Sequence, residues 1–230
     1  MNSAEILATL QAASARIAQL EAERGALEAE RDRLAAETGE ARGPVAIVGT
    51  ALRFPGAATL SEYWELLLSG GDAITEPPPG RFAGLPRPPA PHLLAGYLHD
   101  IARFDHALFS IAPDEARHMD PQQRHLLELT FAALVDAGIP PQDLADRAVG
   151  VFLGLAKNFY GERPGNPSAH SATGGLVSCA AGRIAHQFSF AGPAMVVDTA
   201  CSSALVAIHL AVRALRAGEI DTAIVGASNL

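Results

Sequence analysis

The stretch Ala194-Met195-Val196-Val197-Asp198-Thr199-Ala200-Cys201-Ser202-Ser203 decides the fold of this 230-residue chain. Its first four residues are apolar and predict a short buried strand. Residues 204–217 follow and are apolar nearly all round, which predicts a helix in the middle of a larger core. Between them a single cysteine stands at a tight turn. This strand–turn–helix order is the layout of a nucleophile elbow, in which the reactive atom sits at the first turn of a helix.

The position of Cys201 suits nucleophilic chemistry. The thiolate is the reactive form of cysteine, and the free N–H groups and positive dipole end of a helix favour an anion at that place. The backbone N–H of Cys201 can also point at an oxygen that becomes negative during acyl transfer. The alternative is a buried core cysteine, which is a common fate for this residue. Spacing alone leaves both interpretations open.

Composition excludes several classes of function. A net charge of −8 argues against nucleic acid or an anionic membrane surface as a partner. The two cysteines, Cys179 and Cys201, are too few for a disulfide framework, so a cytoplasmic thiol protein is expected. We find no uninterrupted apolar run of about 18 residues and no signal peptide at Met1. Neither His-x-x-x-His nor Cys-x-x-Cys spacing occurs, so no metal site is expected.

The string Asp198-Thr199-Ala200-Cys201-Ser202-Ser203 resembles the active-site signature of the β-ketoacyl synthase (ketosynthase) domains of modular type I polyketide synthases. The resemblance extends over residues 44–230. It is carried by Arg53-Phe54-Pro55-Gly56, by Met119-Asp120-Pro121-Gln122-Gln123-Arg124 and by Gly182-Arg183-Ile184-Ala185. Thr50 and Leu52 depart from it, because methionine and cysteine are frequent there. The resemblance implies the first half of a thiolase-like layered fold.

The resemblance also implies an activity. Cys201 would accept an acyl chain from an acyl carrier protein, and a malonyl-type extender on a second carrier protein would then lose CO₂ and attack the thioester. Phosphopantetheine would be presented by the carrier protein, with no cofactor bound directly. In the family two histidines from the second half support decarboxylation, and they lie downstream of anything in this chain. The family forms homodimers.

Residues 3–38 carry a heptad pattern, which predicts a coiled coil. The first apolar row contains Ile6, Ala13, Leu20, Leu27 and Leu34. The second row, Leu10, Ile17, Arg24 and Arg31, turns basic. A single solvated helix is the alternative, although such a helix would be only marginally stable. The segment resembles the helix that docks a modular synthase to the upstream polypeptide and helps it dimerise. The expected domains are therefore a docking helix (1–38), a linker (39–44) and a truncated ketosynthase portion (45–230).

Strands alternating with helices predict an α/β fold with a mainly parallel sheet. We expect buried strands at 45–49, 149–154, 194–197 and 221–227. Helices are expected at 61–69 (capped by Ser61), 121–137 (capped by Asp120), 173–187 and 204–217. Within them we expect Cys179 to be a core residue and His125 to be solvated.

Three functions remain in competition. The first is decarboxylative chain elongation by a β-ketoacyl synthase, an acyltransferase. The second is a non-catalytic docking module made of a coiled coil and a half-fold. The third is a Cys201-dependent acyl carrier or hydrolase. We further expect the 230 residues alone to expose a large apolar face and to aggregate or bind a partner.

Overall fold

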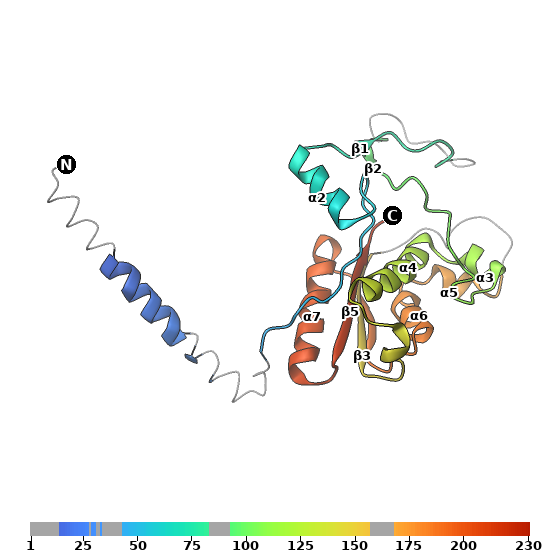
Figure 1. Cartoon of the computed structure of the whole chain (residues 1–230). Helices are drawn as coiled ribbons and strands as arrows, with labels where there is room; N and C mark the ends of the chain where they lie inside the picture. Colours follow the sequence, from blue (N-terminus) through green and yellow to red (C-terminus); the bar gives the residue numbers. More distant parts are fainter. Residues whose placement is uncertain (1–13, 28, 31–32, 34–42, 83–92, 157–167) are drawn as a thin grey trace. The chain divides into compact units, whose positions relative to one another are not determined.

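The computed structural model describes residues 14–27, 29, 30, 33, 43–82, 93–156 and 168–230. By its internal contacts the chain divides into two units, Met1–Pro44 and Val45–Leu230. In the first unit residues 14–27 form a helix whose side chains are all exposed (Figure 1). The heptad positions Ile17, Leu20 and Leu27 are 58%, 46% and 71% exposed. The heptad positions at 6, 10, 13, 31 and 34 lie outside the described residues, so the coiled coil stays a prediction.

A three-stranded parallel sheet forms the centre of the second unit. Its order is β4 (Ala194–Val197), β3 (Val149–Leu155), β5 (Thr222–Ser228). The predicted strands at 149–154, 194–197 and 221–227 are thereby confirmed as parallel neighbours. Every residue of β3 is buried, as expected for a central strand covered on both faces. The register pairs the last residue of β4 with Gly154 of β3.

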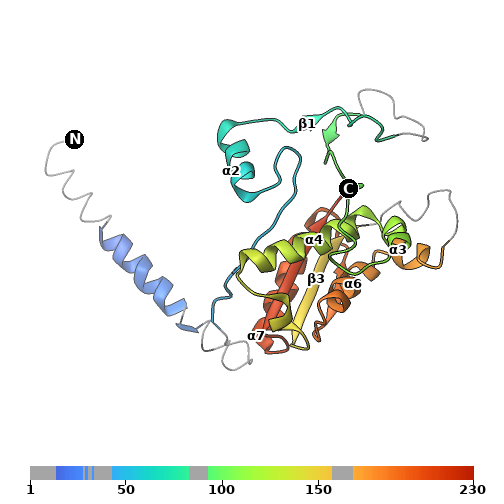
Figure 2. The ribbon, with the colours of Figure 1, turned by 45° about the vertical axis from the view of Figure 1, so that its right-hand side comes forward.

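Helices cover both faces of this sheet (Figures 1 and 2). On one face α7 (Ser203–Ala217) packs its small residues Ala207, Ala211 and Ala214 against the sheet around Phe152. On the other face lie α4 (Pro121–Asp136) and α6 (Cys179–Gln187), which contribute to a separate and larger cluster. This layered α/β arrangement is the predicted fold class.

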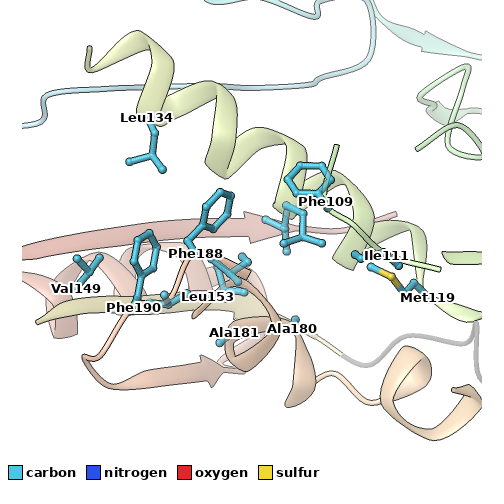
Figure 3. Close-up of a cluster of buried hydrophobic side chains, with 14 of the residues drawn as sticks. Phe109, Ile111, Met119, Leu134, Val149, Leu153, Ala180, Ala181, Phe188 and Phe190 are labelled. Atoms are coloured by element: carbon cyan, nitrogen blue, oxygen red, sulfur yellow. The ribbon is translucent and has the colours of Figure 1, made fainter. Parts of the chain in front are cut away.

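The larger cluster contains a run of aromatic rings between the sheet and α4 (Figure 3). Phe109 stacks on Phe104 at 5.4 Å between ring centroids and meets Phe188 edge-on at 6.4 Å. Phe188 in turn stacks on Phe190 at 5.5 Å. Such pairs contribute roughly 0.5–1.5 kcal/mol each beyond their burial. They hold the chain after α6, which leads into β4, against the sheet.

The start of α4 is a buried polar junction. Asp120 caps the helix by accepting a hydrogen bond from the Gln122 N–H at 2.7 Å, as predicted, and Pro121 occupies the first turn. The Gln123 amide nitrogen donates to the carbonyls of Thr173, Gly174 and Leu176 at 3.1–3.2 Å. The Gln123 carbonyl accepts from Arg183 Nε at 2.9 Å, which ties α4 to α6. These hydrogen bonds give the motif a structural role, because they join α4 to the segment before α6 and to α6 itself.

The other elements of the second unit are, in chain order, α2 (Leu60–Ser69), β1 (Ile74–Thr75), β2 (Ala95–Gly96), α3 (Pro113–His118), η1 (Pro141–Leu144), α5 (Ser171–Gly175) and η3 (Ala200–Ser202). The strands β1 and β2 form a two-stranded antiparallel ladder.

The prediction of a buried strand at 45–49 is wrong for this structure. The segment is extended but belongs to no strand, and Ile47 is 85% exposed. Its end is instead fixed to the C-terminal part of α4. A Cβ on Gly49 would lie 2.2 Å from the Ala133 carbonyl oxygen, and the Thr50 N–H donates to Asp136 Oδ2 at 2.8 Å. These contacts with the helix replace the expected strand pairing.

The predicted cap of α2 is also wrong. The N-cap is Thr59, whose hydroxyl accepts from the Glu62 N–H, while Glu62 accepts from the Thr59 N–H. This reciprocal capping box places the N-cap two residues before Ser61, and the helix begins at Leu60. The large apolar side chains of α2 are exposed, with Trp64 at 60% and Leu68 at 69%.

The helix predicted over 173–187 is two helices, α5 and α6, separated by residues 176–178. The break follows from the Gln123 side chain, which takes up carbonyl groups of this segment. Cys179 consequently begins α6 and is only half-buried, so its assignment as a core residue is wrong. The burial predicted for β4 is wrong too, because its first two residues are exposed.

α7 was expected at the centre of a larger core, but only one of its faces is covered. Leu205 is 70% exposed and Ile208 is 48% exposed, whereas Ala207 is fully buried. Among the described residues, one helical stretch, Ala200–Ala217, is long and apolar enough to cross a membrane by length and composition alone. It contains serines, a histidine and arginines, so the absence of an uninterrupted apolar run of about 18 residues still holds, and one face of α7 packs on the sheet.

Candidate functional site

The candidate site is the connection from β4 to α7. β4 ends at Val197, η3 spans Ala200–Ser202, and α7 starts at Ser203. Because the strands are parallel, this connection lies at the edge where all three strands end, which is where α/β sheets place their sites. The predicted strand–turn–helix order around Cys201 is confirmed.

Gly154 brings the start of α7 close to the end of β3. A Cβ at this position would lie 2.7 Å from the Ser203 carbonyl carbon and 2.8 Å from the Ala204 nitrogen. Both are backbone atoms, so no side chain could turn away to make room. The missing side chain of Gly154 therefore sets how closely the elbow sits on the sheet.

The elbow contains a strained residue next to the cysteine. Ala200 has φ +55°, a left-handed conformation that costs a non-glycine residue roughly 1–2 kcal/mol. Its N–H donates to Asp198 Oδ1 at 3.0 Å, which helps to hold this conformation. Strain of this kind persists only where neighbouring groups determine it, and it gathers at functional sites. This strain could not be predicted from the sequence, since alanine does not favour the left-handed conformation.

Two serine hydroxyls complete the elbow. Ser203 Oγ accepts from the Thr199 N–H at 2.9 Å and donates to the Ala200 carbonyl at 2.7 Å. Ser202 Oγ donates to the Thr199 carbonyl at 2.8 Å and lies 2.9 Å from Thr199 Oγ1. Ser203 is buried and Ser202 is exposed.

Cys201 itself is exposed and belongs to no disulfide. In the part of the chain that the structure describes, its backbone N–H has no hydrogen-bond acceptor and its thiol has no hydrogen-bond partner. The thiol therefore stands at the start of a helix, in contact with solvent, beside an N–H that is available to a ligand. A thiolate and a developing oxyanion are both favoured at such a place. Cys179, in contrast, lies at the first turn of α6, outside the elbow.

The structure places a cavity elsewhere. It has a volume of about 990 Å³ and lies between residues 53–62, residues 97–105 and α4, and Cys201 is not among its lining residues. Arg53 and Glu128, which both line the cavity, form an ion pair with 2.6 Å between Nη1 and Oε2. The elbow residues do not line this cavity, so it does not form part of the candidate site.

His125 lines this cavity and was wrongly expected to be solvated. It is 4% exposed, and its Nδ1 lies 2.6 Å from Arg53 Nη1, so that Nδ1 accepts the hydrogen bond. Burial, followed by the Arg53 charge, lowers the pKa of His125 below 6.5. Burial likewise raises the pKa of the Asp120 carboxyl. This burial was not predicted from the sequence, because residues 120–125 are mainly polar and polar residues are mostly exposed in folded proteins.

Among the described residues, no group of three or more histidine, cysteine, aspartate or glutamate side chains could hold a metal ion. The described histidine nearest in sequence to Cys201, His209, lies eight positions along in α7 and is exposed. The elbow therefore offers a thiol, a helix N-terminus and a backbone donor as its chemical groups.

A layered α/β unit that presents a cysteine on a nucleophile elbow belongs to the class of thiol acyl-transfer folds, and comparisons with known proteins narrow this class. Residues 42–230 match the family model of the β-ketoacyl synthase N-terminal domain. The chain belongs to the β-ketoacyl synthase family.

Its relatives are polyketide synthases. It is 48% identical over 189 residues to the spectinabilin polyketide synthase system protein NorA' of Streptomyces orinoci, covering 80% of this chain and 5% of that protein. It is 45% identical over 197 residues to the pikromycin polyketide synthase component PikAII of Streptomyces venezuelae, covering 80% of this chain and 5% of that protein. The chain therefore spans about one-twentieth of the length of these relatives.

Solved structures agree in fold. The ketosynthase from module 6 of the bacillaene synthase of Bacillus subtilis 168 is 39% identical, with a TM-score of 0.71, over 80% of this chain and 31% of that one. The oxazolomycin ketosynthase domain OzmH KS7 of Streptomyces albus JA3453 is 35% identical, with a TM-score of 0.70, over 80% of this chain and 34% of that one. The prediction of a thiolase-like ketosynthase fold is confirmed.

Proposed function

We propose that this chain supplies the acylated half of a polyketide synthase ketosynthase, with Cys201 as the residue that accepts the growing acyl chain. The observation that carries the proposal is the elbow itself. An exposed thiol stands at a helix start, next to an uncommitted N–H, in a chain of the β-ketoacyl synthase family. That family membership favours the synthase over a non-catalytic docking module.

The acylation step follows from these groups. The Cys201 thiolate attacks the carbonyl carbon of an acyl thioester, and the carbonyl oxygen takes up the negative charge. The backbone N–H of Cys201, which has no acceptor among the described residues, stabilises that charge. The tetrahedral intermediate then releases the thiolate of the donor, which takes up a proton. The donor would be the phosphopantetheine arm of an acyl carrier protein, and no cofactor need bind to this chain.

The condensation step needs groups that the described residues do not provide. A malonyl-type extender on a carrier protein would lose CO₂, and the resulting carbanion would attack the Cys201 thioester, forming a carbon–carbon bond and releasing the cysteine. Decarboxylation requires donors that stabilise the enolate oxygen, and in the described part of the elbow only the backbone and hydroxyls noted above are present. We assign that role to residues outside this chain.

The N-terminal unit has a separate role in this proposal. Residues 1–38 would dock to an upstream synthase polypeptide as a coiled coil and assist homodimerisation, and residues 39–44 would link them to the ketosynthase portion, 45–230. Support comes from the helix at 14–27, in which Ile17, Leu20 and Leu27 are exposed although they are apolar. Leu20 and Leu27 lie on the first heptad row and Ile17 on the second, and apolar side chains on such rows gain burial only against a partner helix.

The experiment uses the native polypeptide that carries this chain. It is supplied with an acyl thioester and malonyl-loaded carrier protein, and CO₂ release and the β-ketoacyl product are measured together. We expect Cys201→Ala to abolish the product, and Cys179→Ala, the matched control, to retain it. Equal product from the wild type and Cys201→Ala would overturn the proposal.

A further inference from the structure

The Ser203 hydroxyl occupies an unusual place in the elbow. It is buried, with the residue 6% exposed, and it joins the peptide group before Thr199 to the peptide group between Ala200 and Cys201. It accepts from the Thr199 N–H at 2.9 Å and donates to the Ala200 carbonyl oxygen at 2.7 Å. The Ser203 backbone N–H donates to the same oxygen. One residue thus fixes both sides of the strained Ala200.

The Ala200 carbonyl and the Cys201 N–H belong to one peptide group. That group is planar and trans, so its C=O and N–H point in opposite directions. When Ser203 holds the carbonyl toward the first residue of α7, the Cys201 N–H is turned the other way. This agrees with the structure, where that N–H has no acceptor among the described residues. The direction of the N–H is therefore set by Ser203.

We propose that Ser203 is a positioning residue, which holds the Cys201 N–H where it stabilises the oxyanion formed during acyl transfer. This inference rests on the proposed function of Cys201. Without the Ser203 hydroxyl, Ala200 loses the bridge that maintains φ +55° and relaxes toward an ordinary conformation. The peptide plane then rotates, and the N–H leaves its alignment while the thiol remains in place on the helix.

A comparison of two reactions of the Cys201 thiol distinguishes a misoriented N–H from unfolding or burial of the cysteine. Acylation by an N-acetylcysteamine thioester forms a C–S bond and places a negative charge on the carbonyl oxygen before the N-acetylcysteamine thiolate leaves. Alkylation by iodoacetamide forms a C–S bond and expels iodide, and no oxyanion develops. Loss of oxyanion alignment slows the first reaction only, whereas unfolding or burial of Cys201 changes both.

The experiment measures both rates at Cys201 in the native polypeptide by peptide mass spectrometry, with alkylation of Cys179 as an internal reference. The variants are Ser203→Ala, Ser203→Thr and Ser202→Ala. Ser203→Thr keeps the hydroxyl. Ser202→Ala is the matched control, because its hydroxyl contacts only Thr199. Removing an oxyanion donor outright costs about 10²–10³ in rate, so misalignment should cost at least about tenfold.

The expected result is a loss of about tenfold or more in acylation for Ser203→Ala, with alkylation within about threefold of the wild type. Ser203→Thr should recover most of the acylation rate, and Ser202→Ala should retain it. Equal acylation in Ser203→Ala and the wild type, or a parallel fall in both reactions, would overturn the inference while leaving acylation at Cys201 intact. A wild type that alkylates at Cys201 but is never acylated would overturn the proposed function and this inference with it.

Discussion

At the scale of single residues, the elbow requires that position 154 carries no side chain. Gly154 leaves room for the backbone of α7, and a Cβ there would lie 2.7 Å from the Ser203 carbonyl carbon. We predict that Gly154→Ala destabilises the protein by about 1–3 kcal/mol, since overpacking against backbone forces a shift. The same shift moves Cys201 and slows its acylation.

The matched control is Gly182→Ala on α6. A Cβ at Gly182 has no neighbour within 4 Å, so the substitution should stabilise the helix by about 0.8–1 kcal/mol. Urea unfolding of both variants measures the difference. Equal midpoints for Gly154→Ala and the wild type would contradict the close packing described here.

Part of this residue scale could be predicted from the sequence. The order of an apolar strand, a turn with one cysteine and an apolar helix predicted the elbow at Cys201. The strain at Ala200 and the bridge from Ser203 could not be predicted, because both depend on how α7 is seated against β3. His125 and Gln123 were missed for the same reason, since hydrogen bonds from distant segments make burial of polar side chains tolerable.

At the scale of elements, α4 carries a buried histidine at its first turns. The folded pKa of His125 lies below its ordinary value of 6.5. At a pH between the folded pKa of His125 and 6.5, the unfolded chain binds more protons than the folded one. The free energy of unfolding therefore rises with pH in this range. Its stabilising contribution is fully present above about pH 6.5 and is lost as the pH falls toward the folded pKa.

We therefore predict that the free energy of unfolding decreases between pH 7.5 and pH 5.5, and that His125→Gln flattens this decrease. The exposed His209→Gln should leave the slope unchanged. Urea titrations at several pH values measure the slope. An identical slope in His125→Gln and the wild type would show that this histidine does not control the pH dependence.

The start of α2 offers a second test at this scale. The capping box assigns the cap to Thr59, whereas the sequence pattern favoured Ser61. Thr59→Ala should cost about 1 kcal/mol, and Ser61→Ala should cost only a few tenths. Hydrogen exchange of the α2 amides measures both variants. Faster exchange in Ser61→Ala than in Thr59→Ala would restore the cap predicted from sequence.

At the scale of the whole molecule, apolar side chains remain uncovered on several elements of the second unit. They include Ile47 at 85% exposed, Leu205 at 70% and Leu68 at 69%. Both the parallel sheet and a large exposed apolar face were predicted from the sequence. Which residues form that face was not predicted, because periodicity shows which residues are apolar and not which partner covers them. Such surfaces normally mark contacts with other protein.

We predict that the 230 residues on their own self-associate or bind a partner. Sedimentation velocity and thermal melts test this. A monodisperse monomer that unfolds cooperatively would contradict it.

The N-terminal helix gives a further prediction at this scale. Leu20→Lys places a charge on the proposed coiled-coil row and should weaken association of residues 1–38 with their partner helix. Ala18→Lys, which adds the same charge off that row, should not. Analytical ultracentrifugation of the native polypeptide measures both. Equal association in the two variants would show that the heptad row is not the interface.

The central claim is that Cys201 is the acyl-accepting nucleophile, and one measurement tests it most directly. The native polypeptide is incubated with an acyl thioester in the absence of any extender, and the acylated peptide is mapped by mass spectrometry. The account predicts one acyl group on the peptide that contains Cys201, lost in Cys201→Ala and retained in Cys179→Ala. An acyl group on any other residue, or acylation that persists in Cys201→Ala, would contradict it.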